Sequence, residues 1–174
     1  MPFGALHEPA LAALVLEARA RGVRVEERGA ESPREAIGDL LVAPLWPPRA
    51  ESASRSQNDR SLTLRIELAG RSLLLAGDLE TPAEDALVAS GAPLRADLLK
   101  LSHHGSRTSS SPVFLDAVGG TVAVASAPRW SRFGMPHPEV SRRVRDAGYA
   151  HWWTGRDGAV LVGLEPRLWV RGWQ

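Results

Sequence analysis

The chain contains no cysteine, a single lysine among its 21 basic residues, and no apolar run as long as a membrane helix. Without cysteine it can form neither disulfide bonds nor thiolate metal sites, so a bound metal would need imidazole and carboxylate ligands. A membrane helix requires roughly 20 apolar residues, and a signal peptide requires a basic leader before an apolar stretch. The sequence shows neither pattern and therefore predicts a soluble domain.

The composition provides enough apolar surface for one hydrophobic core. Of the 174 residues, 44% are hydrophobic and 24% are charged, which is typical of a single globular domain. We therefore expect residues 1–174 to form one domain. The formal net charge of +1 excludes a strong overall attraction to nucleic acid, so a nucleic-acid substrate would require a local basic patch.

Strand-like and helix-like segments alternate along the chain, which predicts a mixed α/β layer architecture. The clearest signal is a hairpin, in which residues 61–68 alternate between polar and apolar, Ala69-Gly70 forms the turn, and residues 72–76 form a buried strand. Residues 47–59 are polar and predict an exposed loop inside the domain. Thr81 and Glu84 form a capping-box signature. Further strands are expected at 23–25, 39–43, 96–101, 121–125, 149–154, 159–164 and 168–170, and helices at 9–21, 81–89, 112–118 and 138–147.

A carboxylate, Asp78, follows the predicted buried strand at 72–76. Ligands in α/β folds gather at the carboxyl ends of strands, and Gly77 before the carboxylate permits the close approach of another group. Asp78 is therefore a candidate metal ligand. On its own, a carboxylate in this place is more often a helix cap or a turn residue.

Two adjacent histidines, His103 and His104, follow the predicted strand at 96–101. Neutral imidazole is the commonest side-chain ligand for zinc and similar metals. One of the two could bind a metal while its neighbour orients it, contacts substrate or moves a proton, and which of them is the ligand stays open. The alternative is a polar pair at the start of a loop.

The histidine pair is followed by a run of hydroxyl side chains and one guanidinium. Such groups, with backbone donors, suit an anion such as phosphate, although a solvated loop is an equally good interpretation of any single serine. The candidates are Ser106, Arg107, Thr108 and Ser109.

His137 lies between two prolines, which fix the backbone and could hold the ring in one place. It is a candidate ligand, supporting residue or proton donor. The remaining histidines, His7 near the terminus and His151 within an aromatic strand, are interpreted as structural.

The combination of these motifs resembles the C-terminal half of the metallo-β-lactamase fold. The match is closest to the hydrolase domain of the ComEC family, competence proteins that internalise DNA. The resemblance runs from about residue 11 to residue 164, and its most specific part is the His-His-Gly-Ser segment followed by Thr-Ser-Ser. The stretches that carry it are 58–62, 74–78, 99–111 and 137–140.

The resemblance implies an αββα sandwich and a site with two metal ions, zinc or manganese. Asp78 would bridge the ions, His103 or His104 would be a terminal ligand, and His137 would line the cleft. The implied reaction is hydrolysis by a metal-activated water, and the implied substrate is single-stranded DNA. The native protein would be membrane-embedded, in the inner membrane of a bacterium.

The first metal motif of this fold, His-x-His-x-Asp-His, is absent from the chain, in which His7 is the only histidine before Asp78. Since a catalytic zinc takes about three protein ligands, the resemblance implies an incomplete domain that lacks N-terminal strands and is inactive in isolation. Two alternatives remain, namely a hydrolase of small esters, lactones or thioesters on the same fold, and a catalytically dead remnant with a binding or structural role.

Overall fold

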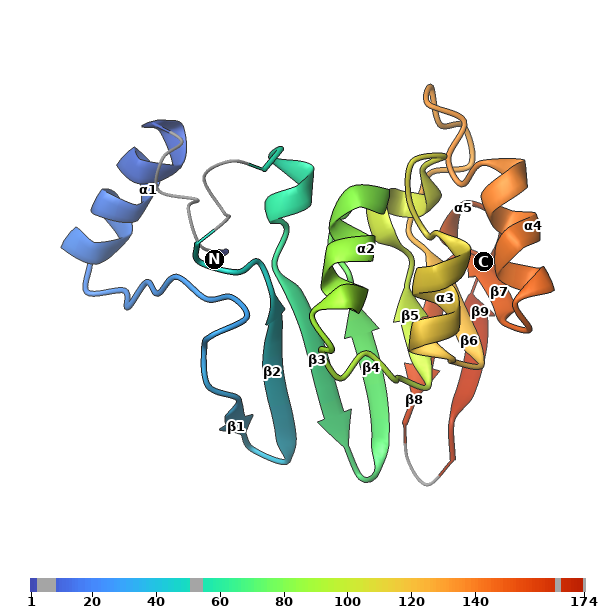
Figure 1. Ribbon diagram of the computed structural model, residues 1–174, viewed down its shortest axis with the longest axis horizontal. Coiled ribbons are helices and arrows are strands. Elements are labelled where there is room, and N and C mark those ends of the chain that lie inside the picture. The colour runs from blue at the N-terminus through green and yellow to red at the C-terminus, as the bar shows by residue number, and fades with distance from the viewer. Residues whose placement is uncertain (3–8, 51–54, 165–166, 174) are drawn as a thin grey trace.

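The computed structural model describes residues 1–2, 9–50, 55–164 and 167–173, and these form a mixed α/β fold (Figure 1). One sheet contains seven strands in chain order, antiparallel from β1 to β4 and parallel from β4 to β7. They are β1 (Glu35–Ile37), β2 (Leu40–Trp46), β3 (Thr63–Leu68), β4 (Arg71–Leu75), β5 (Leu98–Lys100), β6 (Val122–Ala125) and β7 (Ala150–Trp153). A separate antiparallel pair consists of β8 (Ala159–Gly163) and β9 (Trp169–Trp173).

Helices line one face of the large sheet (Figure 1). Three of them, α2 (Thr81–Ala89), α3 (Pro112–Val118) and α4 (Pro138–Asp146), lie in front of the sheet, whereas α1 (Pro9–Ala20) stands away from it. A single turn, α5 (Thr154–Asp157), joins β7 to β8, and two short 3₁₀ helices are η2 (Asn58–Arg60) and η3 (Ser102–Gly105). None of the helices that the structure describes combines the length and the apolar character needed to cross a bilayer.

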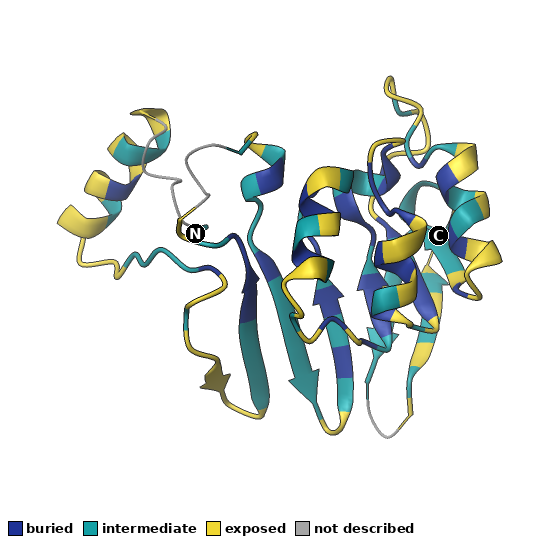
Figure 2. Ribbon diagram, viewed as in Figure 1, coloured by how far each residue is buried: buried dark blue, intermediate teal, exposed yellow. Residues whose placement is uncertain are grey.

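The core lies between these helices and the central strands, where Figure 2 shows the buried segments. The helices cover the buried residues of β5 and β6, which consist mostly of apolar side chains. Fully buried side chains from the sheet meet fully buried side chains from the helices. They include Leu74, Leu99 and Ala123 from the strands and Leu87, Phe114 and Val144 from the helices.

The local signals predicted most of these elements. The hairpin of β3 and β4 is confirmed, and its turn residues Ala69 and Gly70 both have positive φ, as the turns that match strand twist require. The strand expected at 23–25 is wrong, since those residues form no strand. The apolar run at 39–43, which Pro44 was expected to end, is part of β2, and β2 runs on to Trp46 with a register irregularity between Pro44 and Trp46. Part of the loop expected at 47–59 lies outside the described residues, as does His7.

His151 lies inside β7, and we expect it to make stability depend on pH. Burial and the positive charges of Arg156 and Arg145 lower the pKa of His151 to about 4, although the negative charge of Asp157 acts in the opposite direction. Within the described residues, neither ring nitrogen has a hydrogen-bond partner. The unfolded chain, in which histidine has its ordinary pKa of about 6.5, therefore takes up a proton that the folded chain excludes.

The stability of the protein is thus expected to fall as the pH drops from about 6.5 to 4, with His151 contributing about 2 kcal/mol of that loss after solvent screening. Urea unfolding of the wild type and of His151→Phe at both pH values measures the contribution. The variant should lose less stability between the two pH values, and an equal loss in both proteins would contradict the assignment.

Candidate functional site

The carboxyl ends of three neighbouring strands bring together the polar residues that the sequence singled out. β4 ends before Gly77 and Asp78, β5 ends before His103 and His104 in η3, and β6 ends before Ser126. Because β4, β5 and β6 are parallel, these ends lie at one edge of the sheet. This edge is where an α/β fold most often places a ligand.

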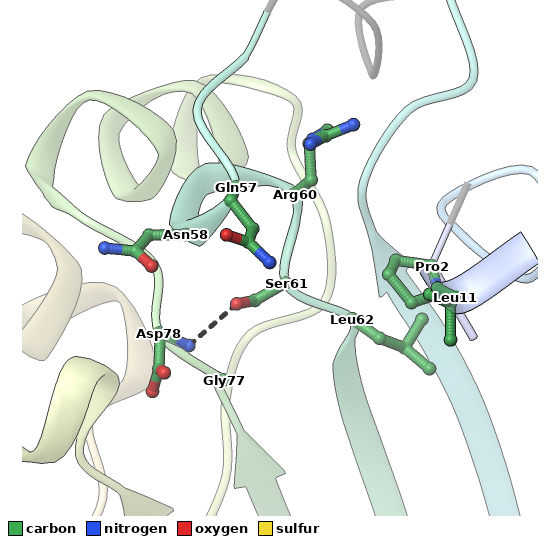
Figure 3. Close-up of a pocket in the computed structure, with 9 residues that line it drawn as sticks. All are labelled: Pro2, Leu11, Gln57, Asn58, Arg60, Ser61, Leu62, Gly77 and Asp78. Carbon is green, nitrogen blue, oxygen red and sulfur yellow. Dashed lines mark hydrogen bonds between the residues drawn. The ribbon is translucent and has the colours of Figure 1, made fainter. Parts of the chain in front are cut away.

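Asp78 is held by a tight turn. Gly77 has φ +62°, and a Cβ added there would lie 2.5 Å from Cβ of Ser61, so the position requires glycine. The backbone N–H of Asp78 donates to Oγ of Ser61 at 2.9 Å (Figure 3). Beside this turn lies a hollow of about 570 Å³, whose walls include Arg60 and Leu11 of α1 (Figure 3). The backbone of Asp78 is therefore fixed at the border of an open space.

The single lysine of the chain lies next to this carboxylate. Nζ of Lys100, at the end of β5, donates to the carbonyl of Gly77 at 3.0 Å and lies 3.7 Å from Oδ1 of Asp78. Burial lowers the pKa of Lys100, and the carboxylate of Asp78 acts in the opposite direction. Sequence reasoning missed this residue, although its position just before the histidine segment was a usable signal.

His104 has one ring nitrogen directed at Asp78. Its Nδ1 lies 2.6 Å from the carbonyl oxygen of Ser126, which can only accept a hydrogen bond, so Nδ1 carries the proton. In the neutral imidazole with this tautomer, Nε2 has the lone pair, and it lies 3.6 Å from Oδ1 of Asp78. A carbonyl that fixes the tautomer in this way is the usual support of a metal-binding histidine.

His103 faces a different carboxylate. Its Nδ1 lies 3.5 Å from Oε1 of Glu80 and is buried, with no hydrogen-bond partner in the part of the chain that the structure describes. Both histidines have a left-handed backbone conformation, with φ 44° for His103 and 58° for His104. This conformation costs of order 1–3 kcal/mol for each residue. This backbone, with His103 N–H bonded to the carbonyl of Gly77, sends the rings apart, their centroids 6.4 Å from each other.

The hydroxyl run after the histidines is largely engaged in internal bonds. Ser109 is fully buried and donates to the carbonyls of Ser102 and Ser106. Thr108 donates to Glu80 at 2.8 Å and lies 3.1 Å from the hydroxyl of Ser106. Arg107 forms an exposed ion pair with Glu139 at 2.6 Å. These groups shape the loop, and anion binding by Ser106, Arg107, Thr108 and Ser109 stays a prediction.

A buried carboxylate anchors this loop from behind. Glu84 is fully buried and accepts backbone N–H bonds from Ser110 at 2.6 Å and Ser111 at 2.8 Å. Burial raises the pKa of Glu84, and these hydrogen bonds act in the opposite direction. The capping-box prediction for Glu84 is wrong, because α2 has Glu80 as its N-cap residue and Glu84 binds another segment. Arg143 of α4 adds bonds to the carbonyls of Ser109 and Ser110.

His137 is tied to the same segment through its backbone. Its N–H donates to the carbonyl of Gly105 at 2.9 Å, and the residue is the N-cap of α4. Its ring lies beside Gly134, where an added Cβ would be 3.6 Å from Cε1. Among the described residues, no ion pair links this ring to Asp78, so a metal-binding role for His137 stays a prediction.

The pair of Asp78 and His104 fits part of a metal site. Two ligands at about 2.1 Å from one ion are at most about 4.2 Å apart, and the observed 3.6 Å lies within that limit. Within the described ranges, no group of three or more histidine, aspartate or glutamate side chains is placed to hold a metal. Since a catalytic zinc takes about three protein ligands, these residues alone do not complete a site.

The fold and these side chains define a mixed α/β domain with a polar site at the carboxyl ends of its parallel strands. No family model matches the chain. Competence protein ComA of Neisseria gonorrhoeae is 40% identical over 116 residues, which make up 66% of this chain and 17% of that protein. ComE operon protein 3 of Bacillus subtilis is 34% identical over 168 residues, 97% of this chain and 21% of that protein.

A third relative, recombination protein 2 of Haemophilus influenzae, is 33% identical over 119 residues, 68% of this chain and 15% of that protein. The chain belongs with the ComEC-like competence proteins, as the resemblance predicted. It spans about a fifth or less of the length of these curated relatives.

Proposed function

We propose that this chain forms part of a metal-dependent hydrolase domain in a ComEC-like DNA-uptake protein, and that the complete domain cleaves phosphodiester bonds of DNA. The observation that carries the proposal is the Asp78–His104 pair, with the tautomer of His104 fixed by the carbonyl of Ser126. Relatives named for competence and recombination support DNA as the substrate. A divalent ion, zinc or manganese, would supply an activated water and stabilise charge on the phosphoryl oxygen.

The proposal includes the αββα sandwich of the metallo-β-lactamase fold. One mixed sheet with α2, α3 and α4 over one face corresponds to one β layer and one helix layer of such a sandwich. The other layer and the remaining metal ligands would then come from elsewhere in the longer polypeptide. In that arrangement the hollow beside Asp78 is the space into which those ligands project.

The residues of this chain have separate tasks in the proposed site. Asp78 and His104 are ligands, and Lys100 holds the carbonyl of Gly77 and places a positive charge beside the carboxylate. His103, in contact with Glu80, positions the turn and does not face Asp78. Arg107 and Thr108 are exposed, and in this proposal they exchange their bonds with Glu139 and Glu80 for contacts with a phosphate.

We expect the isolated chain to show no metal-dependent nuclease activity, and a complete ComEC-like polypeptide that contains it to cleave single-stranded DNA with Mn²⁺ or Zn²⁺. In the complete polypeptide, Asp78→Asn and His104→Ala should each lower the cleavage rate by about 100-fold or more, since loss of even an outer-shell partner costs 10- to 100-fold. The measurement is release of nucleotides from a labelled oligonucleotide.

Asp116→Asn is the matched control, because this carboxylate is exposed on α3, away from the site, and the rate should not change. Unchanged cleavage by Asp78→Asn would contradict the proposed role of the pair. Cleavage by the isolated chain that disappears in Asp78→Asn would contradict the inference that the site is incomplete.

A further inference from the structure

The segment from Ser126 to His137, here named the stacking loop, is attached to the candidate site at both ends. At its start, the carbonyl of Ser126 lies 2.6 Å from Nδ1 of His104. At its end, the N–H of His137 donates to the carbonyl of Gly105, and Pro136 packs so closely on Gly105 that an added Cβ would lie 2.7 Å away. The loop is therefore continuous with the turn that carries His104.

The base of the stacking loop is also held by β7 and α5. The carbonyl of Ala127 accepts a bond from Nε1 of Trp153 at 2.9 Å, and its N–H donates to Oγ1 of Thr154 at 3.0 Å. Within the loop, Ser131 accepts bonds from the N–H groups of Phe133 and Gly134. These bonds give the backbone of the loop a defined shape.

Two aromatic side chains of this loop are exposed to solvent. Trp130 is 90% exposed and Phe133 is 59% exposed, on a loop that projects beyond the end of the sheet (Figures 1 and 2). Single exposed apolar residues are common, but two aromatic rings on one anchored loop beside a strand-end site form a patch that a ligand would cover. The guanidinium of Arg132 lies 4.5 Å from the ring centroid of Phe133.

The loop is positively charged and opens toward His104. It contains Arg129 and Arg132 and no acidic residue. A hollow of about 420 Å³ is lined by residues of the loop, Trp130 and Phe133 among them, and by His104. A volume in the range of about 300–1,000 Å³ is typical of sites that hold a small molecule.

We propose that the stacking loop binds unpaired bases of single-stranded nucleic acid, which stack on Trp130 and Phe133 while Arg129 and Arg132 contact the phosphates. Flat rings beside arginine side chains are the means by which proteins bind single strands without reading their sequence. The inference rests on the proposed function, since it places the neighbouring phosphodiester at the Asp78–His104 pair. It also supplies the local basic patch that a nucleic-acid substrate requires on a chain whose net charge is only +1.

An exposed tryptophan and phenylalanine next to arginines could also contact an anionic membrane. The structure favours a nucleic acid, because the hollow reaches His104 and both ends of the loop are bonded to the turn of the candidate site. A membrane anchor has no need of either feature. Vesicles are therefore included in the test as a competing ligand.

The test measures fluorescence anisotropy of the 174-residue chain with a labelled oligothymidylate of about 15 nucleotides, at low salt and with EDTA present. An oligonucleotide of equal length with abasic sites carries the same charge and no bases. Wild-type protein should bind the base-bearing strand more tightly. Trp130→Ala should weaken that binding by about 5- to 100-fold and leave binding of the abasic strand unchanged, whereas Trp130→Phe should retain most of it.

Trp169→Ala is the matched control, because Trp169 is 47% exposed at the end of β9 far from α5, and its loss should not change binding. Equal binding of the two strands by the wild type, or full binding by Trp130→Ala, overturns the proposal. So does Trp130-dependent binding to phosphatidylglycerol vesicles without binding of the oligonucleotide.

The two proposals can fail separately. The binding experiment needs no metal, so its outcome does not depend on cleavage, and the control variant Asp116→Asn, on the exposed face of α3, should bind the oligonucleotide as the wild type does. If the strand binds through Trp130 and the complete polypeptide shows no cleavage, the hydrolase proposal fails and the stacking loop stands. If cleavage depends on Asp78 and base-dependent binding is absent, the stacking loop fails.

Discussion

Replacing Glu84 by alanine is expected to lower the free energy of unfolding by about 3–5 kcal/mol, because it removes a buried acceptor and leaves its donors behind. The carboxylate is fully buried and accepts from the N–H groups of Ser110 and Ser111 at 2.6 and 2.8 Å. Each N–H left unpaired in the interior costs about 1–3 kcal/mol. Ser110 has φ 55°, so the segment already carries backbone strain that this carboxylate helps to offset.

Urea unfolding measures this effect, and Asp85→Ala is the matched control because Asp85 is the exposed neighbour on the same helix. Glu84→Gln should lie between the wild type and Glu84→Ala, since its amide presents one acceptor oxygen and turns an NH₂ group toward the second N–H. A loss below about 1 kcal/mol in Glu84→Ala would show that water or a shifted loop satisfies the two donors.

Replacing Gly105 by alanine is expected to cost about 2–4 kcal/mol and to disturb the candidate site as well. Gly105 has φ +82°, and an added Cβ would lie 2.7 Å from Cβ and 3.1 Å from Cα of Pro136. The proline ring cannot rotate away, so either the turn with His104 or the stacking loop must move. Oligonucleotide binding should therefore weaken together with stability.

Gly148→Ala separates the two causes, since Gly148 has φ +87° and nothing within 4 Å of the added Cβ. It should show only the cost of the left-handed backbone, about 1–2 kcal/mol, and no change in oligonucleotide binding. Equal losses of stability in the two variants would mean that the contact with Pro136 relaxes at no cost.

The sequence predicted those elements whose cause is local. The hairpin of β3 and β4 has its alternation and its turn in one short stretch, and the helices α2, α3 and α4 each have proline as their first or second residue. The strand predicted at 23–25 failed because a three-residue alternation carries little information without a partner strand. Glu84 was assigned to a capping box because its true donors lie in a loop 26 residues further along the chain.

In the candidate site, too, the sequence predicted what has a local cause and missed what depends on contacts between distant segments. The strand-end positions of Asp78 and His104 were readable from the apolar runs before them, and the structure brings the two side chains within 3.6 Å. The sequence could not separate His104 from His103, because the directions of the two rings follow from the left-handed backbone of the turn. Lys100 and Glu80 were missed because their roles depend on distances across strands.

The change of strand direction at β4 has a consequence for the order of folding. The pairs β1–β2 and β3–β4 form across short connections, whereas β4, β5 and β6 pair only after longer segments have closed. Contacts between distant parts of a chain form late, because the entropy of closing the intervening loop is lost first. Asp78 follows β4 and His104 follows β5, so the two side chains meet only after the segment between these strands has closed. We therefore expect the pair to assemble late in folding. A chain that halted at the hairpin stage would carry both residues without a site.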